Sequence, residues 1–145
     1  MKQLILASQS PRRKELLAQL GYQFTTQAAD IAESVQCNEN AQDYVVRLAK
    51  EKAQAIFLAL PVQQQAQSIV IGSDTSVVIE GDILGKPANE AECITTLLRL
   101  EGKQHQVLTA IAVAIQDQKN QMVSELIETQ VQFKALTVDE IKRYW

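Results

Sequence analysis

Residues 3–21 constrain the fold more than any other stretch of this chain. Gln3–Ala7 is a short apolar run that ends in a polar loop, which is typical of a buried β-strand. Ser10 then suits the N-cap of a helix, Pro11 suits its first helical position, and Gly21 suits its end. The sequence therefore predicts a strand, a short polar loop and a helix in direct succession.

The first turn of this helix carries three cations, Arg12, Arg13 and Lys14, at the end where the helix dipole is positive. These charges repel one another unless an anion binds to the exposed N–H groups and the side chains. Helix N-termini are common phosphate sites in proteins. We therefore expect the anion to be a phosphate group.

Composition favours one globular domain that binds a small polyanion. The 145 residues are 46% hydrophobic and 21% charged, which is enough for one apolar core. A formal charge of -3 with cations in small groups disfavours nucleic acid as a partner. No apolar run reaches the roughly 18 residues that span a membrane, and Cys37 and Cys93 form no disulfide or metal-ligating pattern. We expect a cytoplasmic protein without a nucleic-acid or membrane partner.

Helices and strands alternate along the rest of the chain. Helices are predicted over 41–60, between the cap Asn89 and the stop Gly102, and from the capping box Thr137–Glu140. Surface turns are predicted at 61–65, 80–82 and 116–121, and strands over 68–71, 76–79, 83–84, 107–115 and 129–135.

The last predicted helix stops at Trp145, soon after it begins. Ile141, Tyr144 and Trp145 form an apolar face that has no evident partner in the sequence. Two alternatives follow: the chain is shortened, or another chain, such as a second copy in a homodimer, covers this face.

Asp74 is an acid between two strongly apolar segments, Ile69–Ile71 and Val77–Ile79. Burying a carboxylate there is costly, so the group needs a purpose. It could bind a metal, accept a proton from water, or only satisfy backbone N–H groups at a bend. Gly72 just before it suits a bulge or the close approach of another element.

Lys52 completes the apolar stripe of the predicted helix over 41–60, which includes Val45, Leu48 and Ile56. A buried ammonium needs a carboxylate or a phosphate partner, and a snorkelling lysine at the stripe's edge is the alternative. His105, the only histidine, is expected to pack or to order a turn.

A polyphosphate with a divalent ion suits the remaining charged residues. Phosphoryl chemistry needs fixed cations and one base that orients water. The candidates are one acid in a strand, one acid in a loop and four cations: Asp74, Glu33, Arg12, Arg13, Lys52 and Lys86.

Five ordered blocks carry a resemblance to a known family: Leu6–Arg13 with Glu15–Leu17, Arg47–Ala53, Gly72–Thr75, Leu84–Pro87 and Gly102–Thr109. Over essentially its whole length the chain resembles the Maf proteins, which are nucleoside triphosphate pyrophosphatases. Arg12 and Thr75 look like the subgroup that hydrolyses dTTP and UTP, because the subgroup that acts on 7-methyl-GTP typically has Trp and Gln at these positions.

The resemblance implies a single Maf-like domain over 1–145 that lacks the family's usual C-terminal segment. It implies an α/β fold similar to inosine triphosphatases, in which helices flank a mixed twisted sheet and a nucleotide cleft lies between two lobes. The implied reaction converts dTTP, UTP and modified pyrimidine nucleotides to the monophosphate and pyrophosphate. It would require a divalent metal cation, Mg²⁺, Mn²⁺ or Co²⁺.

The resemblance also implies roles for single residues. Asp74 would be the general base, and Glu33 would help with the metal or the water. The triphosphate would be held by Ser8, Arg13, Lys52 and Lys86, and base specificity would depend on Arg12 and Thr75. Ala32 stands where many members have a second acid. The alternative function is a catalytically impaired nucleotide-binding regulator of cell division and septum formation.

Overall fold

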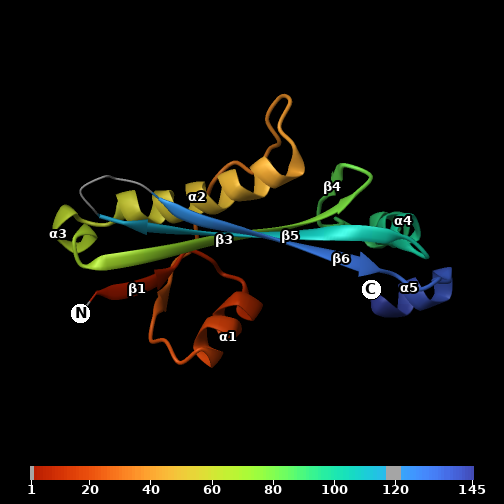
Figure 1. Ribbon diagram of the computed structural model, residues 1–145. Helices are drawn as coiled ribbons and strands as arrows, with labels where there is room; N and C mark the ends of the chain where they lie inside the picture. The colour runs from red at the N-terminus through yellow and green to blue at the C-terminus, as the bar shows by residue number, and fades with distance from the viewer. Residues whose placement is uncertain (1, 117–121) are drawn as a thin grey trace.

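The computed structural model describes residues 2–116 and 122–145, so most of the turn predicted at 116–121 lies outside the described residues. Figure 1 shows the elements in chain order. They are β1 (Gln3–Leu6), α1 (Pro11–Gln19), β2 (Thr25–Thr26), α2 (Ala41–Ala59), α3 (Val62–Gln65), β3 (Ser68–Ile79), β4 (Asp82–Leu84), α4 (Glu90–Leu100), β5 (Gln104–Ile115), β6 (Val123–Gln132) and α5 (Val138–Tyr144).

The described strands form one mixed sheet of six strands in the order β2-β1-β3-β5-β6, with β4 also paired to β3. The pairs that β1 makes with β2 and β3 are parallel, and the other pairs are antiparallel. Helices flank this sheet, with α2 on one side and α1 on the other (Figure 1). The predicted α/β class with a mixed sheet and flanking helices is confirmed.

The main core lies between α2 and the sheet. Its residues come from the apolar stripe of α2 and from the strand positions that face it, and they include Val45, Leu48, Ala49, Ala53, Val70, Val78, Leu108 and Ala110. Small side chains let the helix lie close to β3. A Cβ built on Gly72 would lie 2.2 Å from the carbonyl oxygen of Ala49, so only glycine fits there.

Gly72 therefore marks a close approach and not a bulge. The ladder between β3 and β5 runs in unbroken register from Ile69 to Val78. The two predicted strand segments around Asp74 are one continuous strand, because β5 supplies hydrogen-bond partners to the polar residues between them.

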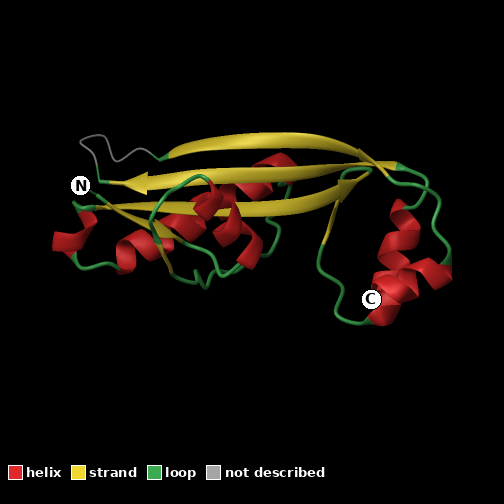
Figure 2. Cartoon of the chain, turned by 90° about the horizontal axis from the view of Figure 1, so that it is seen from below, coloured by secondary structure: helices red, strands yellow, loops and turns green. Residues whose placement is uncertain are grey.

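α4 and α5 pack together at the far end of the sheet (Figure 2). Ile141 is buried there, with 1% of its surface exposed, so it does have a partner in this chain and the prediction for it was wrong. Tyr144 and Trp145 are 79% and 56% exposed, as expected. His105 packs edge-on against Phe133 at 4.8 Å between ring centroids, which confirms that it packs.

Other elements also differ from the predictions. The surface turn at 61–65 contains the short helix α3. β5 begins at Gln104 instead of 107, and β6 covers Val123–Gln132 instead of 129–135. In both strands pairing extends into polar residues, because ladder hydrogen bonds form between backbone groups whatever the side chains are.

Candidate active site

A gap in the sheet exposes the middle of β3. β5 occupies one edge of β3, and β1 and β4 share the other edge. β1 pairs only as far as Ile71, and β4 pairs only from Val77 onward. The edge from Gly72 to Ser76 therefore has no described strand beside it, and the chain turns away from this gap after β1 and again after β4.

An ion cluster of one lysine and two acids lies beside this gap. Lys52 Nζ on α2 lies 2.8 Å from Glu33 Oε1 and 3.0 Å from Asp74 Oδ1. The Lys52 side chain is only 13% exposed and Asp74 is 7% exposed. Lys52 is thus paired with carboxylates, and the snorkelling alternative does not describe it.

The charge on Lys52 is stabilised by its partners. Burial alone would lower the pKa of Lys52, but hydrogen bonds and charges from Glu33 and Asp74 outweigh it and raise the pKa above its ordinary value. The ammonium therefore stays charged at neutral pH. Among the described residues, Asp74 accepts hydrogen bonds only from the side chains of Lys52 and Ser76, so it does not serve a backbone bend.

A hollow of about 230 Å³ adjoins the ion cluster. It lies between the β1–α1 connection, the loop before α2, and α2 itself, and its polar lining includes Ser8, Gln9, Asp30, Glu33 and Lys52. Ser8 Oγ accepts a hydrogen bond from Ser10 N at 3.0 Å. Ser10 Oγ accepts one from Arg13 N at 3.3 Å, so Ser10 is the predicted N-cap.

Arg13 and Thr75 lie on the other face of the sheet from Asp74, because successive strand residues point to opposite faces. Arg13 Nη2 donates to Thr75 Oγ1 at 3.2 Å. The hydroxyl of Thr109 lies 3.2 Å from that of Thr75 across the β3–β5 ladder. The motif block contained Thr109 without indicating a role, and only the antiparallel register reveals the contact.

The structure does not bring Arg12 or Lys86 into the ion cluster. Both side chains are exposed, and neither forms a hydrogen bond or ion pair with another described residue. Lys86 follows Leu84, where β4 ends beside the gap in β3. Lys86 therefore lies near the site, but no side chain among the described residues holds its ammonium in place.

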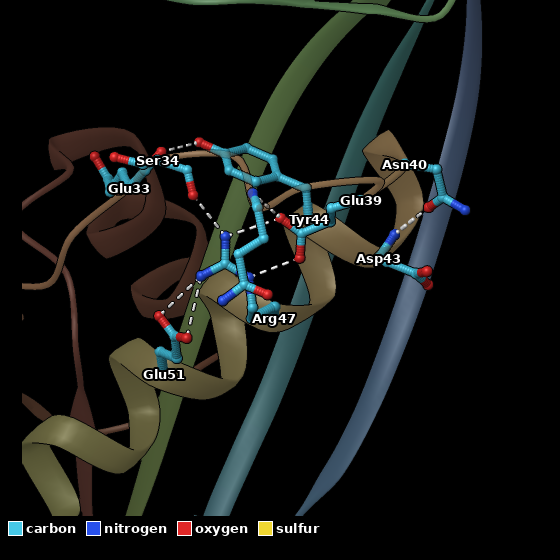
Figure 3. A network of polar contacts seen from close by, with 9 residues as sticks. Glu33, Ser34, Glu39, Asn40, Asp43, Tyr44, Arg47 and Glu51 are labelled. Atoms are coloured by element: carbon cyan, nitrogen blue, oxygen red, sulfur yellow. Dashed lines mark hydrogen bonds and ion pairs between the residues drawn. The ribbon is translucent and has the colours of Figure 1, made fainter.

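Sequence reasoning missed two residues of α2 that hold the loop carrying Glu33. The Tyr44 hydroxyl donates to the carbonyl oxygen of Glu33 at 2.6 Å, and Arg47 binds the next carbonyl, that of Ser34 (Figure 3). Burial, with the negative charges of Asp74 and Glu33, raises the pKa of Tyr44, which keeps its hydroxyl a donor. The sequence carries no signal for these two contacts, because they join α2 to a loop whose path only the tertiary structure reveals.

Among the described residues, no group of three or more His, Cys, Asp or Glu side chains lies close enough together to hold a metal ion. No described helix combines the length and the apolar character that crossing a bilayer demands. A metal in the ion cluster would therefore have at most the two carboxylates Glu33 and Asp74 as protein acids.

The chain is similar in sequence to known proteins. The chain matches the family described as Maf-like protein over residues 3–145. It is 58% identical to the dTTP/UTP pyrophosphatase of Colwellia psychrerythraea over 99% of this chain, and it spans 66% of that relative's length. It is 49% identical to the dTTP/UTP pyrophosphatase of Vibrio parahaemolyticus over 98% of this chain and 71% of the relative.

Solved structures show the same fold at low identity. The nucleoside-triphosphatase, or dITP/XTP pyrophosphatase, of Mycobacterium abscessus aligns with a TM-score of 0.52 and 14% identity, over 91% of this chain and 74% of that one. The Ham1 protein of Staphylococcus aureus also gives 0.52, with 13% identity over 90% and 72%. These likenesses support the fold, and the family match together with close relatives at 46–58% identity shows that the chain belongs to the Maf family.

Proposed function

We propose that this chain hydrolyses dTTP and UTP to the nucleoside monophosphate and pyrophosphate. The observation that supports this most strongly is the ion cluster of Lys52, Glu33 and Asp74 at the gap in the sheet. The two relatives compared above are named dTTP/UTP pyrophosphatases, and they align with this chain through every block that contributes to the site.

In this proposal Asp74 accepts a proton from water as the water adds to the α-phosphorus. The bond from that phosphorus to the bridging oxygen breaks, and pyrophosphate leaves with the bridging oxygen. Asp74 suits this role because it is held in a rigid strand, is largely excluded from solvent, and has an oxygen that Lys52 does not contact.

The triphosphate would lie against the positive groups around the hollow. Lys52 already lines the hollow beside Ser8, whose hydroxyl can donate to a phosphate oxygen. The first turn of α1 lies at the same end, where the helix dipole is positive, and it carries Arg13. Lys86, exposed beyond β4, would close onto the phosphates when substrate is present.

The two carboxylates fit a divalent cation such as Mg²⁺, Mn²⁺ or Co²⁺. Both lie within 3.0 Å of one ammonium, so they can share one cation, and carboxylate oxygens with substrate phosphates are typical Mg²⁺ ligands. Glu33 and Asp74 would hold it. When bound, the cation neutralises charge on the phosphates and favours departure of pyrophosphate.

Base preference would depend on Arg12 and Thr75. Thr75 is fixed by Arg13 and Thr109, so its position varies little when a base arrives. Arg12 directly precedes Arg13 in the chain, and its exposed side chain is available to contact a pyrimidine carbonyl.

The test is pyrophosphate release from dTTP, UTP and 7-methyl-GTP, with Mg²⁺ or with a chelator. Metal-dependent release from dTTP and UTP above that from 7-methyl-GTP supports the proposal, and equal metal-independent rates contradict it. Asp74→Asn should lower kcat by at least about 100-fold and leave the Kd for dTTP within a few-fold, since asparagine keeps the shape of the side chain and one oxygen for the cation but removes the base. Tight binding of dTTP without turnover by the unaltered chain would favour the regulatory alternative.

We also propose that the chain forms a homodimer through the exposed aromatic side chains Tyr144 and Trp145. Analytical ultracentrifugation of the chain and of Trp145→Ser should show a dimer that dissociates in the variant. A monomer at all concentrations would contradict this.

A further inference from the structure

The loop that carries Glu33 depends on side chains for its position. Residues 27–40 connect β2 to α2 without forming a helix or a strand. The Glu33 side chain is 55% exposed, so packing does not hold it. Yet its carboxylate lies 2.8 Å from Lys52 Nζ. The ion pair with Lys52, together with contacts to the backbone of the loop, must therefore determine where this carboxylate sits.

Two neighbouring side chains of α2 bind two consecutive carbonyl groups of this loop (Figure 3). Tyr44 donates to the carbonyl of Glu33 at 2.6 Å, and Arg47 Nη2 donates to the carbonyl of Ser34 at 2.8 Å. Residues three apart lie side by side on a helix. The backbone that bears Glu33 is thus held by the same helix that carries Lys52.

Arg47 also ties down the other end of the loop. Its Nε and Nη2 bind the two carboxylate oxygens of Glu39 at 2.7 and 2.9 Å, and its Nη1 lies 3.1 Å from Glu51 Oε1. Glu39 is nearly buried, with 8% of its side chain exposed. Hydrogen bonds to Arg47 lower the pKa of Glu39, and those to Glu39 raise the pKa of Arg47.

All three guanidinium nitrogens of Arg47 therefore donate hydrogen bonds. The guanidinium carbon Cζ also lies over the Tyr44 ring, 5.7 Å from its centroid. Only a planar fork of donors can bind Glu39 with two parallel bonds and reach a backbone carbonyl as well. Arg47 contacts neither Lys52 nor Asp74 in the described structure. Its connection to the ion cluster runs through the loop.

We propose that Arg47 is a positioning residue that fixes the loop so that Glu33 meets Lys52 in the active site. The effect on turnover that we expect from this role rests on the proposed pyrophosphatase activity. Arg47 itself touches no reacting group, so its effect on turnover should depend on Glu33. A residue that served only stability would lower activity whether or not Glu33 is present.

The kinetic experiment is a double-mutant cycle measured with dTTP and Mg²⁺. Arg47→Met should lower kcat about 10- to 100-fold, the usual effect of losing a group that orients a ligand, while KM for dTTP changes less than about threefold. In Glu33→Gln the same substitution should lower kcat less than about twofold. Arg47→Lys should not restore kcat, and Lys134→Met, which breaks the exposed pair with Glu140, is the matched control.

An unchanged kcat in Arg47→Met, or an equal loss in the Glu33→Gln background, would overturn the proposal. If the unaltered chain releases no pyrophosphate from any triphosphate, the proposed function fails. The role of Arg47 in holding the loop can still be tested, because it predicts where the loop lies in each variant. That position is measured independently of activity, by a spin label on Cys37.

Cys37 is exposed within this loop, whereas Cys93 is buried, so a thiol-specific spin label reports on the loop. Arg47→Met should convert the spectrum of the label from slow to fast motion, with the thermal midpoint used to confirm folding. Tyr44→Phe, which removes only the bond to the Glu33 carbonyl, should also increase the motion and decides the question if Arg47→Met does not fold. An unchanged spectrum in a folded variant contradicts the inference.

Discussion

Replacing Lys52 with methionine tests the central electrostatic feature of the site. Met fills similar space, but it removes the ammonium that lies 3.0 Å from the buried Asp74 carboxylate. Breaking a buried ion pair on one side typically costs about 3–5 kcal/mol, because the other charge is left buried and unpaired. Glu33 is 55% exposed and can return to water, so we expect a loss of about 2–4 kcal/mol.

The assay is urea unfolding at neutral pH of the unaltered chain, Lys52→Met, Asp74→Asn and the double variant. In a thermal melt of a chain of this size, a loss of 3 kcal/mol would appear as a fall of roughly 6–12 °C in Tm. The double variant should recover most of the lost stability, since the unpaired charge is gone. The matched control is Lys134→Met, whose exposed pair with Glu140 should contribute less than about 1 kcal/mol.

A loss below about 0.5 kcal/mol in Lys52→Met would refute the reasoning, since that is the range of ordinary surface substitutions. Failure of Asp74→Asn to restore stability in the double variant would also refute it. The pairing energy would then not reside between these two residues.

Two further predictions concern packing. Gly72→Ala should lower the free energy of unfolding by at least about 2 kcal/mol, because its Cβ would lie 2.2 Å from a backbone oxygen of α2 that cannot move aside. The control is Gly85→Ala, where a Cβ meets nothing within 4 Å. In the same urea assay its free energy of unfolding should change by no more than about 0.5 kcal/mol. Burial lowers the pKa of His105 below its ordinary value of 6.5. As the pH falls, the unfolded chain therefore binds a proton at His105 more readily than the folded chain does. The stability that neutral His105 contributes is present above pH 6.5 and is lost as the pH falls below it. His105→Phe should therefore lose less stability than the unaltered chain between pH 7.5 and pH 5, and parallel pH curves for the two proteins would contradict this.

Local signals predicted the helices well. Ser10, Asn89 and Thr137 each accept a hydrogen bond from the backbone N–H three residues later, as N-caps do. A cap involves only neighbouring residues, so its sequence pattern is sufficient. The apolar stripe over 41–60 also predicted which side of α2 is buried, because helical spacing determines which residues share a face.

Strand boundaries could not be predicted in the same way. β3 runs through Asp74, and β6 starts six residues before the predicted strand, because each follows the partner strand beside it. Pairing joins residues that are distant in the sequence. Local hydrophobicity therefore underestimates a strand whose polar residues are hydrogen-bonded to a neighbour.

The sequence by itself determined the chemical types at the site: a strand acid, a lysine on the buried stripe of a helix, and a capped helix start that bears cations. Tertiary structure alone decided which of these meet. It joined Asp74 and Glu33 through Lys52, placed Thr75 on the opposite face with Arg13, and left Arg12 and Lys86 in solvent. The physical reason is that residue types and periodicity are local properties, whereas register, the close approach at Gly72 and the loop held by Arg47 arise only when distant segments pack together.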